Sequence, residues 1–448
     1  MTLGRSTPPP GTPERRRPRG GAPIGVALLG CGTVGGGVMR LLAENASAFA
    51  ERVGVPLEVR HVVVRDLDKP RVDACPRALL RSDPAPIFED PAVEIVVEVM
   101  GGIEPAHALV GRALASGRSV VTANKALLAK HGPALFEAAA EHKVDIAFEA
   151  AVGGGIPIIR TLRDSFASDD VTEIVGILNG TTNYILSAMT ERGESYDVAL
   201  AAAQAKGFAE VDPTLDVGGF DAAQKLLVLA MLAFGASARE DEIEIAGIQA
   251  IEASDIQFSD RFGFTIKHLV IGRDRGDAVE LRAHPALVRK SSVLSNVSGA
   301  LNAIKLEGRA LGPCLLSGRG AGDMPTAVSV VADLLDVARG AVAGVPGLST
   351  LGALPSRRPL FAPSAASQRF YLRFSVADKP GVMGRLAGAL GDSGVSIEQI
   401  VQTTREGGAD VIMITHEALV GDLRRALGRI DAEQILARPA MVLRIEDV

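Results

Sequence analysis

The sequence predicts an α/β protein in three parts: a doubly wound N-terminal domain, an α+β domain and a small C-terminal α/β module. Over the first third of the chain, apolar runs of strand length alternate with Ala- and Leu-rich helical stretches, which indicates βαβ units. A Gly-, Pro- and Ser-rich stretch late in the chain indicates a linker. After it the expected order of elements is β-α-β-β-α-β, which is typical of a ferredoxin-like sandwich.

The composition sets bounds on the class of protein. A chain of 448 residues exceeds one small core and predicts two or three domains. Hydrophobic residues at 47% and charged residues at 22% are typical of globular enzymes, and no apolar run approaches the roughly 18–20 residues that cross a membrane. The net charge of −6 argues against a nucleic-acid surface. Three cysteines without a C-x-x-C pair favour a reducing cytoplasm over a disulfide framework.

Residues 1–22 are rich in Pro, Gly and Arg and predict a disordered tail. A secretory signal would need an apolar core of at least about seven residues behind the basic cluster, and there is none before Ile24. A basic arm that touches nucleic acid or an anionic membrane stays an alternative, but a solvated leader is favoured.

A glycine-rich turn opens the first domain. Residues 25–37 read G-V-A-L-L-G-C-G-T-V-G-G-G, so a strand at Ile24–Leu29 runs into Gly30, Gly32 and Gly35 before a helical pattern. Glycines at this spacing allow a tight turn, close approach of the backbone to a pyrophosphate and close packing of helix on strand. The N–H groups of the following helix then face the phosphates. The motif predicts a Rossmann-type domain that binds a nicotinamide dinucleotide, with a purely structural turn as the alternative.

The whole of this domain, residues 23–150, alternates strands and helices. Arg65 and then Asp66 follow the second strand, where an acidic residue takes the ribose hydroxyl of NAD. Arg65 can pair with a 2′-phosphate, which favours NADP slightly, whereas Asp66 keeps NAD open and a simple turn role for Arg65 is the alternative. Further strands are expected at Val59–Val64, Ile95–Val99, Ser119–Thr122 and Asp145–Phe148, with helices at Pro105–Ser116 and Gly132–His142.

The second and third parts follow with a linker between them. Residues 151–340 mix strands such as Val171–Leu178 with long helices such as Ala222–Ala233, and the final helices of this block are open to packing on the first domain. The linker is expected at 341–367 and the last module at 368–448. Strands of that module are expected at 371–376, 394–402, 411–416 and 441–445, with a helix after the turn D-K-P-G-V.

Two lysines are the best candidates for proton transfer. A dehydrogenase needs a group that handles the proton of the substrate hydroxyl, and the seven histidines are scattered without metal spacing. A desolvated lysine can serve instead. Lys125 follows the strand that ends at Thr122, at the carboxyl end where parallel sheets bind ligands. Lys225 lies four residues after Asp221, on the same face of a helix.

The alternative for Asp221 and Lys225 is an ordinary surface ion pair, worth a few tenths of a kcal/mol. Against it, the segment before Lys225 crowds several carboxylates, Glu210, Asp212 and Asp216 among them. A cluster of carboxylates next to one lysine suits a substrate that carries an ammonium group and a hydroxyl.

A run of three glycines follows the last strand of the first domain. The segment E-A-A-V-G-G-G-I-P-I-I-R spans Glu149 to Arg160 and exposes backbone carbonyl and N–H groups. Such a loop can bind a monovalent cation through its carbonyl oxygens or a carboxylate through its N–H groups, and a plain flexible turn is equally open.

Six segments together resemble homoserine dehydrogenase: G-C-G-T-V-G-G-G, T-A-N-K-A-L-L-A, E-A-A-V-G-G-G-I-P-I, L-N-G-T-T-N-Y-I-L, F-A-E-V-D-P-T-L-D-V-G-G-F-D-A-A-Q-K and G-A-G-D-M-P-T-A. They occur in order from about Ile24 to Arg339, and the stretch from Asn179 to Lys225 is much more specific than the glycine turn. F-S-V-A-D-K-P-G-V-M and S-G-V-S-I-E-Q resemble an ACT domain, a module that commonly binds amino acids. The arrangement is similar to that of the monofunctional bacterial enzymes.

The resemblance implies oxidation of L-homoserine to L-aspartate 4-semialdehyde with NADP or NAD, run physiologically toward homoserine for threonine, methionine and isoleucine synthesis. Lys225 would be the general acid/base and Lys125 a second lysine near nicotinamide and substrate. The implied substrate-binding residues are Lys125, Glu210 and Asp221, with Asp216 in support.

The resemblance also implies sites for a cofactor and an ion. A sodium-like cation would lie on the triple-glycine loop at Glu149, Val152, Gly154 and Ile156, mainly on carbonyl oxygens. The implied cofactor-binding residues are Gly30, Cys31, Gly32, Thr33, Val34, Gly35, Arg65, Gly101, Lys125 and Gly207. One departure stands out: Arg319 replaces the proline that usually precedes G-A-G in this family and adds a charge to that loop.

For partners, threonine or a related amino acid is expected at an ACT interface, with oligomerisation as the alternative role of that domain. A homodimer or homotetramer is expected, without a membrane or nucleic-acid partner. One rival function is an oxidoreductase for another short amino-acid aldehyde or hydroxy acid, which the spacing of Glu210, Asp221 and Lys225 disfavours. The other is a catalytically silent amino-acid sensor, which the presence of Lys125 and Lys225 disfavours.

Overall fold

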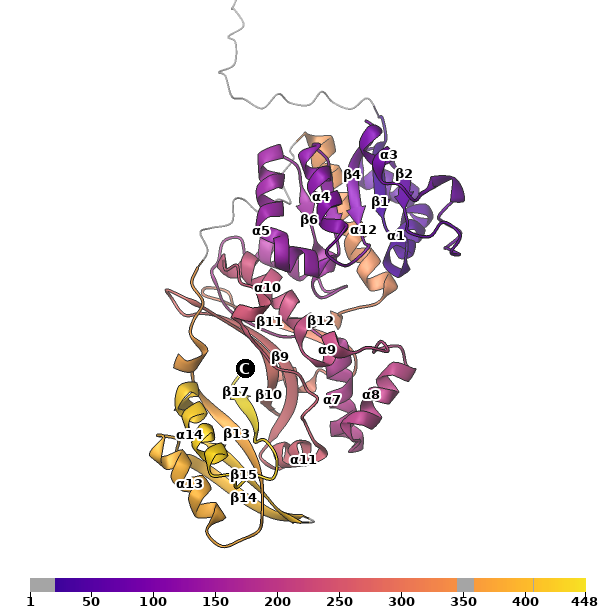
Figure 1. Ribbon diagram of the computed structural model, residues 1–448. Coiled ribbons are helices and arrows are strands. Elements are labelled where there is room, and N and C mark those ends of the chain that lie inside the picture. The colour runs from indigo at the N-terminus through magenta and orange to yellow at the C-terminus, as the bar shows by residue number, and fades with distance from the viewer. Residues whose placement is uncertain (1–20, 345–357, 406) are drawn as a thin grey trace, which may run out of the picture. The chain divides into compact units, whose positions relative to one another are not determined.

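The computed structural model of the protein describes residues 21–344, 358–405 and 407–448 (Figure 1). Nearly all of the tail expected at 1–22 lies outside these residues. The described chain divides into two compact units. Of the described residues, the first unit holds 21–122, 134–147 and 330–344, whereas the second holds 123–133, 148–329 and those from 358 on.

The first unit contains a six-stranded, all-parallel sheet with the strand order β3-β2-β1-β4-β5-β6. All six residues of β1 are buried, because the sheet is covered on both faces. The order reverses between β1 and β4, which is the point where doubly wound sheets bind dinucleotides. The strands are β1 Ile24–Leu29, β2 Leu57–Val63, β3 Leu80–Arg81, β4 Val93–Glu98, β5 Ser119–Thr122 and β6 Ile146–Ala147, with helices α1 Thr33–Glu44, α2 Ala46–Val53, α3 Ala85–Glu89 and α4 Ala106–Ala115.

Helix α5 (Lys125–His142) begins seven residues before the helix expected at Gly132–His142, so that expectation is wrong at its start. The side chain of Asn124 accepts a hydrogen bond from the Leu127 N–H and caps the earlier start. Pro133 lies inside the helix rather than at its beginning. Lys125 is therefore the first residue of a helix, directly behind the carboxyl end of β5.

The second unit is built on an eleven-stranded mixed sheet, counted over the described residues. Its continuous path runs β12-β11-β7-β9-β10-β17-β13-β15-β14, and two short strands pair beside it. The strands are β7 Val171–Ile177, β8 Glu244–Ile245, β9 Phe264–Asp274, β10 Val279–Arg289, β11 Leu301–Gly308, β12 Gly312–Arg319, β13 Ser367–Val376, β14 Ile397–Arg405, β15 Gly408–Thr415, β16 Ala418–Leu419 and β17 Met441–Glu446.

The helices that matter for the site are α7 and α10. Helix α7 spans Gly180–Arg192, and α10 spans Phe220–Phe234 close to the predicted Ala222–Ala233. The remaining α-helices that follow α5 are α6 Ile158–Arg160, α8 Tyr196–Ala205, α9 Thr214–Val217, α11 Ala253–Arg261, α12 Asp323–Ala343, α13 Val382–Asp392 and α14 Val420–Ala432. Among the described residues, no helix has the combined length and apolarity needed to span a membrane.

The C-terminal module has the predicted order β13-α13-β14-β15-α14-β17, with both helices on one face of its strands (Figure 1). Apolar residues such as Phe370, Phe374, Leu386 and Leu423 form its core. Its last strand also joins the neighbouring sheet, because β17 pairs parallel with β10 and antiparallel with β13. One sheet therefore runs through both parts of the second unit.

The linker expected at 341–367 falls partly outside the described residues, which resume at Arg358. From there the chain lies against the sheet: Val279 N–H donates to the Pro359 carbonyl and Phe361 N–H donates to the Val279 carbonyl. The end of the expected linker is thus held by backbone hydrogen bonds to β10.

Candidate active site

The start of helix α10 places an aspartate and a lysine side by side. Gly219 precedes the helix with a φ of +86°, in the left-handed region that favours glycine. A Cβ at this position would stand 2.8 Å from the Nε2 atom of His268 and 3.0 Å from the Ala246 carbonyl oxygen. Glycine therefore lets the chain enter α10 tightly against β9, with Asp221 in the first turn and Lys225 in the next.

Asp221 is a nearly buried carboxylate shared between two lysines. Its Oδ2 atom accepts a hydrogen bond from Lys225 Nζ at 2.7 Å, and its Oδ1 atom lies 3.0 Å from Lys125 Nζ. Burial disfavours its charge, but the two lysines and the amide of Asn179 outweigh this, so the pKa of Asp221 is well below its usual value. The three residues predicted from the sequence to act together do meet.

The ammonium group of Lys225 has a second fixed partner. Its Nζ atom donates to the backbone carbonyl of Leu178, the residue after β7, at 2.7 Å. Lys225 is 8% exposed, so its orientation is set by these two acceptors in a nearly dry environment. Both contacts are at hydrogen-bonding distance and fix the position of the ammonium group.

Asp216 lies next to this pair, on helix α9. Its two carboxylate oxygens accept from Asn179 Nδ2 at 2.7 Å and from Thr181 Oγ1 at 3.2 Å. Burial, and next to it the charge of Asp221, raise the pKa of Asp216 above its usual value. Asp216 therefore belongs to the same hydrogen-bonded cluster as Asp221.

Sequence reasoning did not single out Asn179, although the residue lies in the quoted segment L-N-G-T-T-N-Y-I-L. Its side chain caps helix α7 by accepting from the Thr182 N–H at 2.8 Å and also donates to both Asp216 and Asp221. A polar residue between a strand and a glycine is a common helix-capping signal, but its second role depends on residues far along the chain.

Glu210 and Gly207 lie on the loop between α8 and α9. Both are exposed, and the backbone carbonyl of Glu210 accepts from Gln204 Nε2 at 3.1 Å. Gly207 has a φ of +73°, which this turn requires. Among the described contacts, the structure leaves Glu210 outside the cluster around Asp221, so its predicted role in substrate binding stays a prediction.

In the first unit, the glycine-rich turn has the geometry that the sequence predicts. Gly30 has a φ of +100°, and a Cβ on Gly35 would stand 2.5 Å from the Gly30 carbonyl oxygen, so helix α1 packs directly on the turn. Gly32 and Thr33 are exposed at the start of α1, and Val34 is half-buried. Burial and a contact with Cys75 raise the pKa of the Cys31 thiol to about 12, which keeps it protonated.

Two further cofactor candidates lie at strand ends of the first unit. Gly101, with a φ of +73°, is exposed and donates its N–H to Glu98 Oε1 at 3.2 Å. Glu98 is fully buried, also accepts from Thr122 Oγ1 at 2.6 Å, and so ties the ends of β4 and β5 together. Sequence reasoning missed Glu98. Arg65 is exposed beyond β2, in the position that the sequence suggested.

The triple-glycine loop is folded against the start of helix α6. Glu149 is buried, and its carboxylate accepts from the N–H groups of Ile159 at 2.9 Å and Arg160 at 2.8 Å. Burial raises its pKa in spite of these bonds. The carbonyl of Gly154 accepts from Ser329 Oγ at 2.6 Å, and the φ of Gly154 is +55°. Val152 and Ile156 are buried beside them.

A parallel sheet with a dinucleotide-binding turn, together with a buried lysine held by a carboxylate, defines a nicotinamide-dependent dehydrogenase. Comparisons with known proteins agree. The model for the family "Homoserine dehydrogenase, NAD binding domain" matches residues 30–149, that for "Homoserine dehydrogenase" matches 157–335, and that for "ACT domain" matches 370–433. The chain belongs to the homoserine dehydrogenase family and interconverts L-homoserine and L-aspartate 4-semialdehyde with a nicotinamide cofactor.

Individual relatives match along nearly their whole length. The chain is 41% identical to homoserine dehydrogenase of Synechocystis sp. (94% of this chain, 99% of the relative) and 42% identical to that of Corynebacterium glutamicum (95% and 96%). Among solved structures, homoserine dehydrogenase from Thiobacillus denitrificans has a TM-score of 0.89 at 40% identity, covering 95% of this chain and 99% of that one. A hyperthermophilic archaeal homoserine dehydrogenase in complex with NADPH has a TM-score of 0.60 at 26% identity, covering 70% and 98%.

Proposed function

We propose that Lys225 exchanges a proton with the oxygen of the substrate while the bound nicotinamide cofactor supplies or accepts the hydride. The observation that carries this proposal is the buried Asp221 carboxylate, which holds Lys225 at 2.7 Å and faces Lys125 at 3.0 Å. Two N–H groups of Lys225 point at Asp221 and Leu178, so the third serves the substrate oxygen.

In the direction of homoserine formation, the ammonium of Lys225 gives its proton to the aldehyde oxygen as the carbon is reduced. In the reverse direction the neutral amine accepts the hydroxyl proton. Asp221 keeps Lys225 oriented and, with Lys125, stands beside the reacting oxygen. Asp221 and Glu210 hold the hydroxyl and amino ends of the substrate, and Asp216 supports them. Glu210 is exposed on the loop between α8 and α9.

The test is the change in nicotinamide absorbance with L-homoserine and either NAD⁺ or NADP⁺ at alkaline pH. Lys225→Ala should bind the cofactor and lose at least about a hundredfold in kcat, the usual scale for a lost acid/base. Lys130→Ala is the matched control, because Lys130 is an exposed lysine of α5. Near wild-type turnover of the Lys225 variant would disprove its role, and the same assay ranks the two cofactors.

The glycine-rich turn fits a dinucleotide, and we assign its pyrophosphate to the turn from Gly30 to Gly35 and the start of α1. The segment from Cys31 to Val34, in which Gly32 and Thr33 are exposed, then lines the cofactor together with Gly101 and Lys125, and Gly207 approaches the nicotinamide. Arg65 at the end of β2 supports NADP over NAD, since an exposed guanidinium can pair with a 2′-phosphate. The NADPH complex of the archaeal relative supports the same class of cofactor.

For the loop from Glu149 to Ile156, we propose a monovalent cation such as sodium. Oxygen ligands of the required kind are present, because the buried, desolvated carboxylate of Glu149 and the backbone carbonyl groups of Val152, Gly154 and Ile156 all belong to this loop. A carbonyl oxygen has two lone pairs, so the bond from Ser329 leaves Gly154 able to bind an ion. The cation would stabilise the loop electrostatically.

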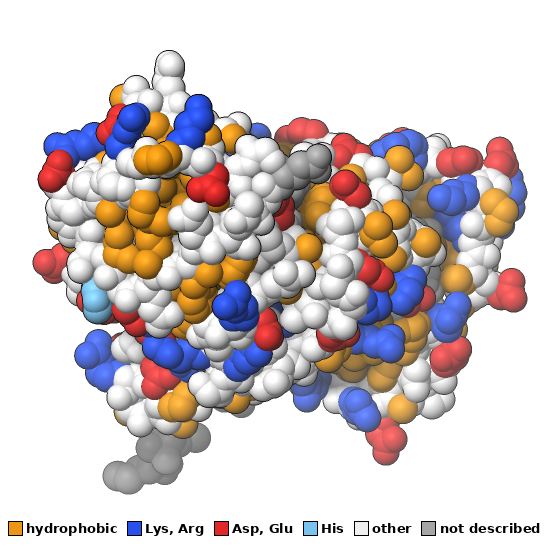
Figure 2. All heavy atoms as spheres, turned by 90° about the horizontal axis from the view of Figure 1, so that it is seen from below, with side chains coloured by type: hydrophobic (Ala, Val, Ile, Leu, Met, Phe, Trp, Pro, Cys, Tyr) orange, Lys and Arg blue, Asp and Glu red, His pale blue; other side chains and the backbone are white. Residues whose placement is uncertain are grey.

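The ACT domain supports feedback control by an amino acid, and we propose threonine as the effector. A homodimer or homotetramer is proposed from the edges of the eleven-stranded sheet, β12 and β14. Each edge presents an apolar side chain, Leu315 and Ile400, that is 44% exposed. Figure 2 shows that hydrophobic side chains gather in patches between charged ones on one face of the molecule.

A further inference from the structure

Asn179 joins the two carboxylates of the site through one amide. It is 4% exposed, and its Nδ2 atom donates to Asp216 Oδ1 at 2.7 Å and to Asp221 Oδ2 at 2.9 Å. Its Oδ1 atom accepts from the Thr182 N–H at 2.8 Å. Both amide hydrogens and the carbonyl oxygen of the side chain are therefore engaged in a nearly buried setting.

The chemistry of this position calls for a neutral side chain with two donors. Asp216 and Asp221 repel each other, and the pKa of Asp216 is raised partly by that repulsion. A carboxamide can face two acceptors with its two N–H groups and brings no charge of its own. A carboxylate at the same place would add a third negative charge, and a hydroxyl has a single donor.

The backbone on either side of Asn179 also helps to position Lys225. Leu178, one residue earlier, offers its carbonyl to Lys225 Nζ, and Asp221 Oδ2 accepts from both Lys225 and Asn179. Gly180, one residue later, packs so closely that a Cβ would stand 2.9 Å from the Ala300 carbonyl oxygen. Leu178 therefore supplies one acceptor of Lys225, and Asn179, the next residue, holds the other acceptor, Asp221. Both residues lie where the backbone is tightly packed.

We propose that Asn179 is a positioning residue of the reaction: its bridge to Asp216 keeps the Asp221 carboxylate turned toward Lys225. The inference rests on the proposed role of Lys225. Asn179 acts on the reaction through Asp221, and its cap of helix α7 is a separate, structural contribution.

Two variants separate the bridge from the cap. Asn179→Ser and Asn179→Asp both retain an oxygen that can accept from the Thr182 N–H, and Ser and Asp are as good as Asn at helix N-caps. Asn179→Ser cannot donate to both carboxylates, and Asn179→Asp repels them. Hydrogen bonds to charged groups contribute about 1.5–3 kcal/mol, so kcat should fall roughly tenfold for the serine variant and about a hundredfold for the aspartate variant.

The readouts are kcat, the KM for each cofactor, Tm, and the primary deuterium isotope effect with homoserine deuterated at the carbon that bears the hydroxyl. We expect KM for the cofactor to stay within about twofold, and the isotope effect to rise as the chemical step becomes limiting. A kcat for Asn179→Asp close to wild type, or losses in kcat that simply follow Tm in both variants without a larger isotope effect, would overturn the proposal. Failure of the Lys225→Ala prediction would instead remove the acid/base assignment itself.

Discussion

Two buried lysines of the second unit have different partners. Lys225 faces the carboxylate of Asp221 at 2.7 Å, whereas Lys267 on β9 donates to the Val297 carbonyl at 2.7 Å and to Asn183 Oδ1 at 3.4 Å. Lys267 is 2% exposed, and burial lowers its pKa to about 8. Burial without a hydrogen-bonded carboxylate is costly for the ammonium group of Lys267, because both of these acceptors, a carbonyl and an amide oxygen, are neutral.

Because of Lys267, the free energy of unfolding should change with pH in the alkaline range. The native protein releases the proton of Lys267 near pH 8, whereas the unfolded chain keeps it to about 10.5, so the unfolded state binds more protons in between. Stability from this group therefore rises across that window, by at most about 3 kcal/mol. Urea unfolding at several pH values should show this rise in the wild type and not in Lys267→Met. A stability difference between the two proteins that stays constant from pH 7.5 to about 10 would contradict the assignment.

At the scale of one element, α10 brings the site together because its start is held tightly. Asp221 and Lys225 lie within the first two turns, and the tight entry depends on Gly219 beside His268 on β9. Because most residues of α10 are buried in close packing, the helix cannot shift to make room for a side chain at position 219.

Gly219→Ala should reduce both stability and turnover. A positive φ costs a non-glycine residue about 1–2 kcal/mol, and here the added Cβ also meets His268 and the Ala246 carbonyl. Gly193→Ala is the matched control, since Gly193 ends α7 with a φ of +66° and has open space around a Cβ. We expect the control to lose stability alone, and Gly219→Ala to lose at least about tenfold in kcat as well. Equal kcat in the two variants would show that the entry to α10 tolerates a shift.

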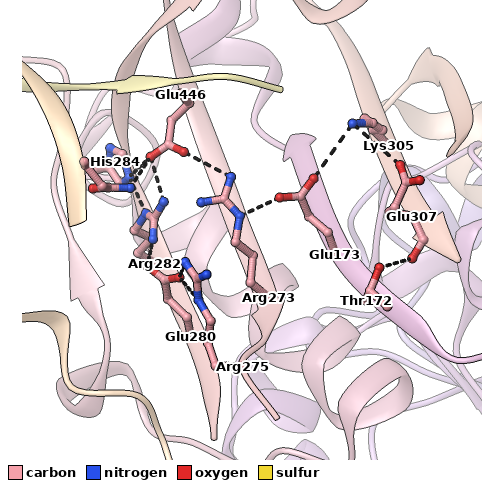
Figure 3. Close-up of polar contacts among 11 residues, drawn as sticks. Thr172, Glu173, Arg273, Arg275, Glu280, Arg282, His284, Lys305, Glu307 and Glu446 are labelled. Carbon is pink, nitrogen blue, oxygen red and sulfur yellow. Dashed lines mark hydrogen bonds and ion pairs between the residues drawn. The ribbon is translucent and has the colours of Figure 1, made fainter. Parts of the chain in front are cut away.

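At the scale of the whole second unit, a buried network of ion pairs lies where β17 of the ACT domain pairs with β10 (Figure 3). Glu446, near the end of β17, accepts from Arg282 at 2.7 Å, Arg273 at 3.2 Å and Gln368 at 3.1 Å. Arg273 also pairs with Glu173 of β7. Burial lowers the pKa of Arg282 to about 10, although Glu446 and Glu280 stand beside it. The network spans five strands of one sheet, β7, β9, β10, β17 and β13, and links the two modules.

Glu446→Gln should destabilise the second unit strongly, because it removes the buried carboxylate that Arg282 and Arg273 share and leaves each of them with one remaining acidic partner. Breaking a buried pair in this way costs about 3–5 kcal/mol. Asp447→Asn, one residue later, removes an ion pair with Arg289 in which the Asp447 side chain is 61% exposed, and should cost less than about 1 kcal/mol. Calorimetry should show a large fall in Tm for the first variant and almost none for the second. Similar small effects in both would mean that the network contributes little to the junction.

The local patterns in the sequence were enough for much of the fold. The alternating apolar runs place β1 and β5 at their observed bounds, and the glycine-rich turn and the order of the C-terminal module are confirmed. The start of α5 was missed, because the capping role of Asn124 competes with a Gly-Pro pair that suggests a later start. Lys225 and Asp221 were found together because a four-residue spacing in a helix is visible in the sequence.

The remaining features depend on contacts between distant segments. The partners of Asn179 lie 37 and 42 residues away in the chain, and Glu98 meets Thr122 across 24 residues. Similarly, β17 joins β10, so the ACT strands extend the catalytic sheet rather than forming a separate one. Periodicity and residue type follow from local backbone geometry and can be read along the chain. Which carboxylate faces which lysine, and which strand completes which sheet, is settled by packing, because only the folded chain brings those groups within hydrogen-bonding distance.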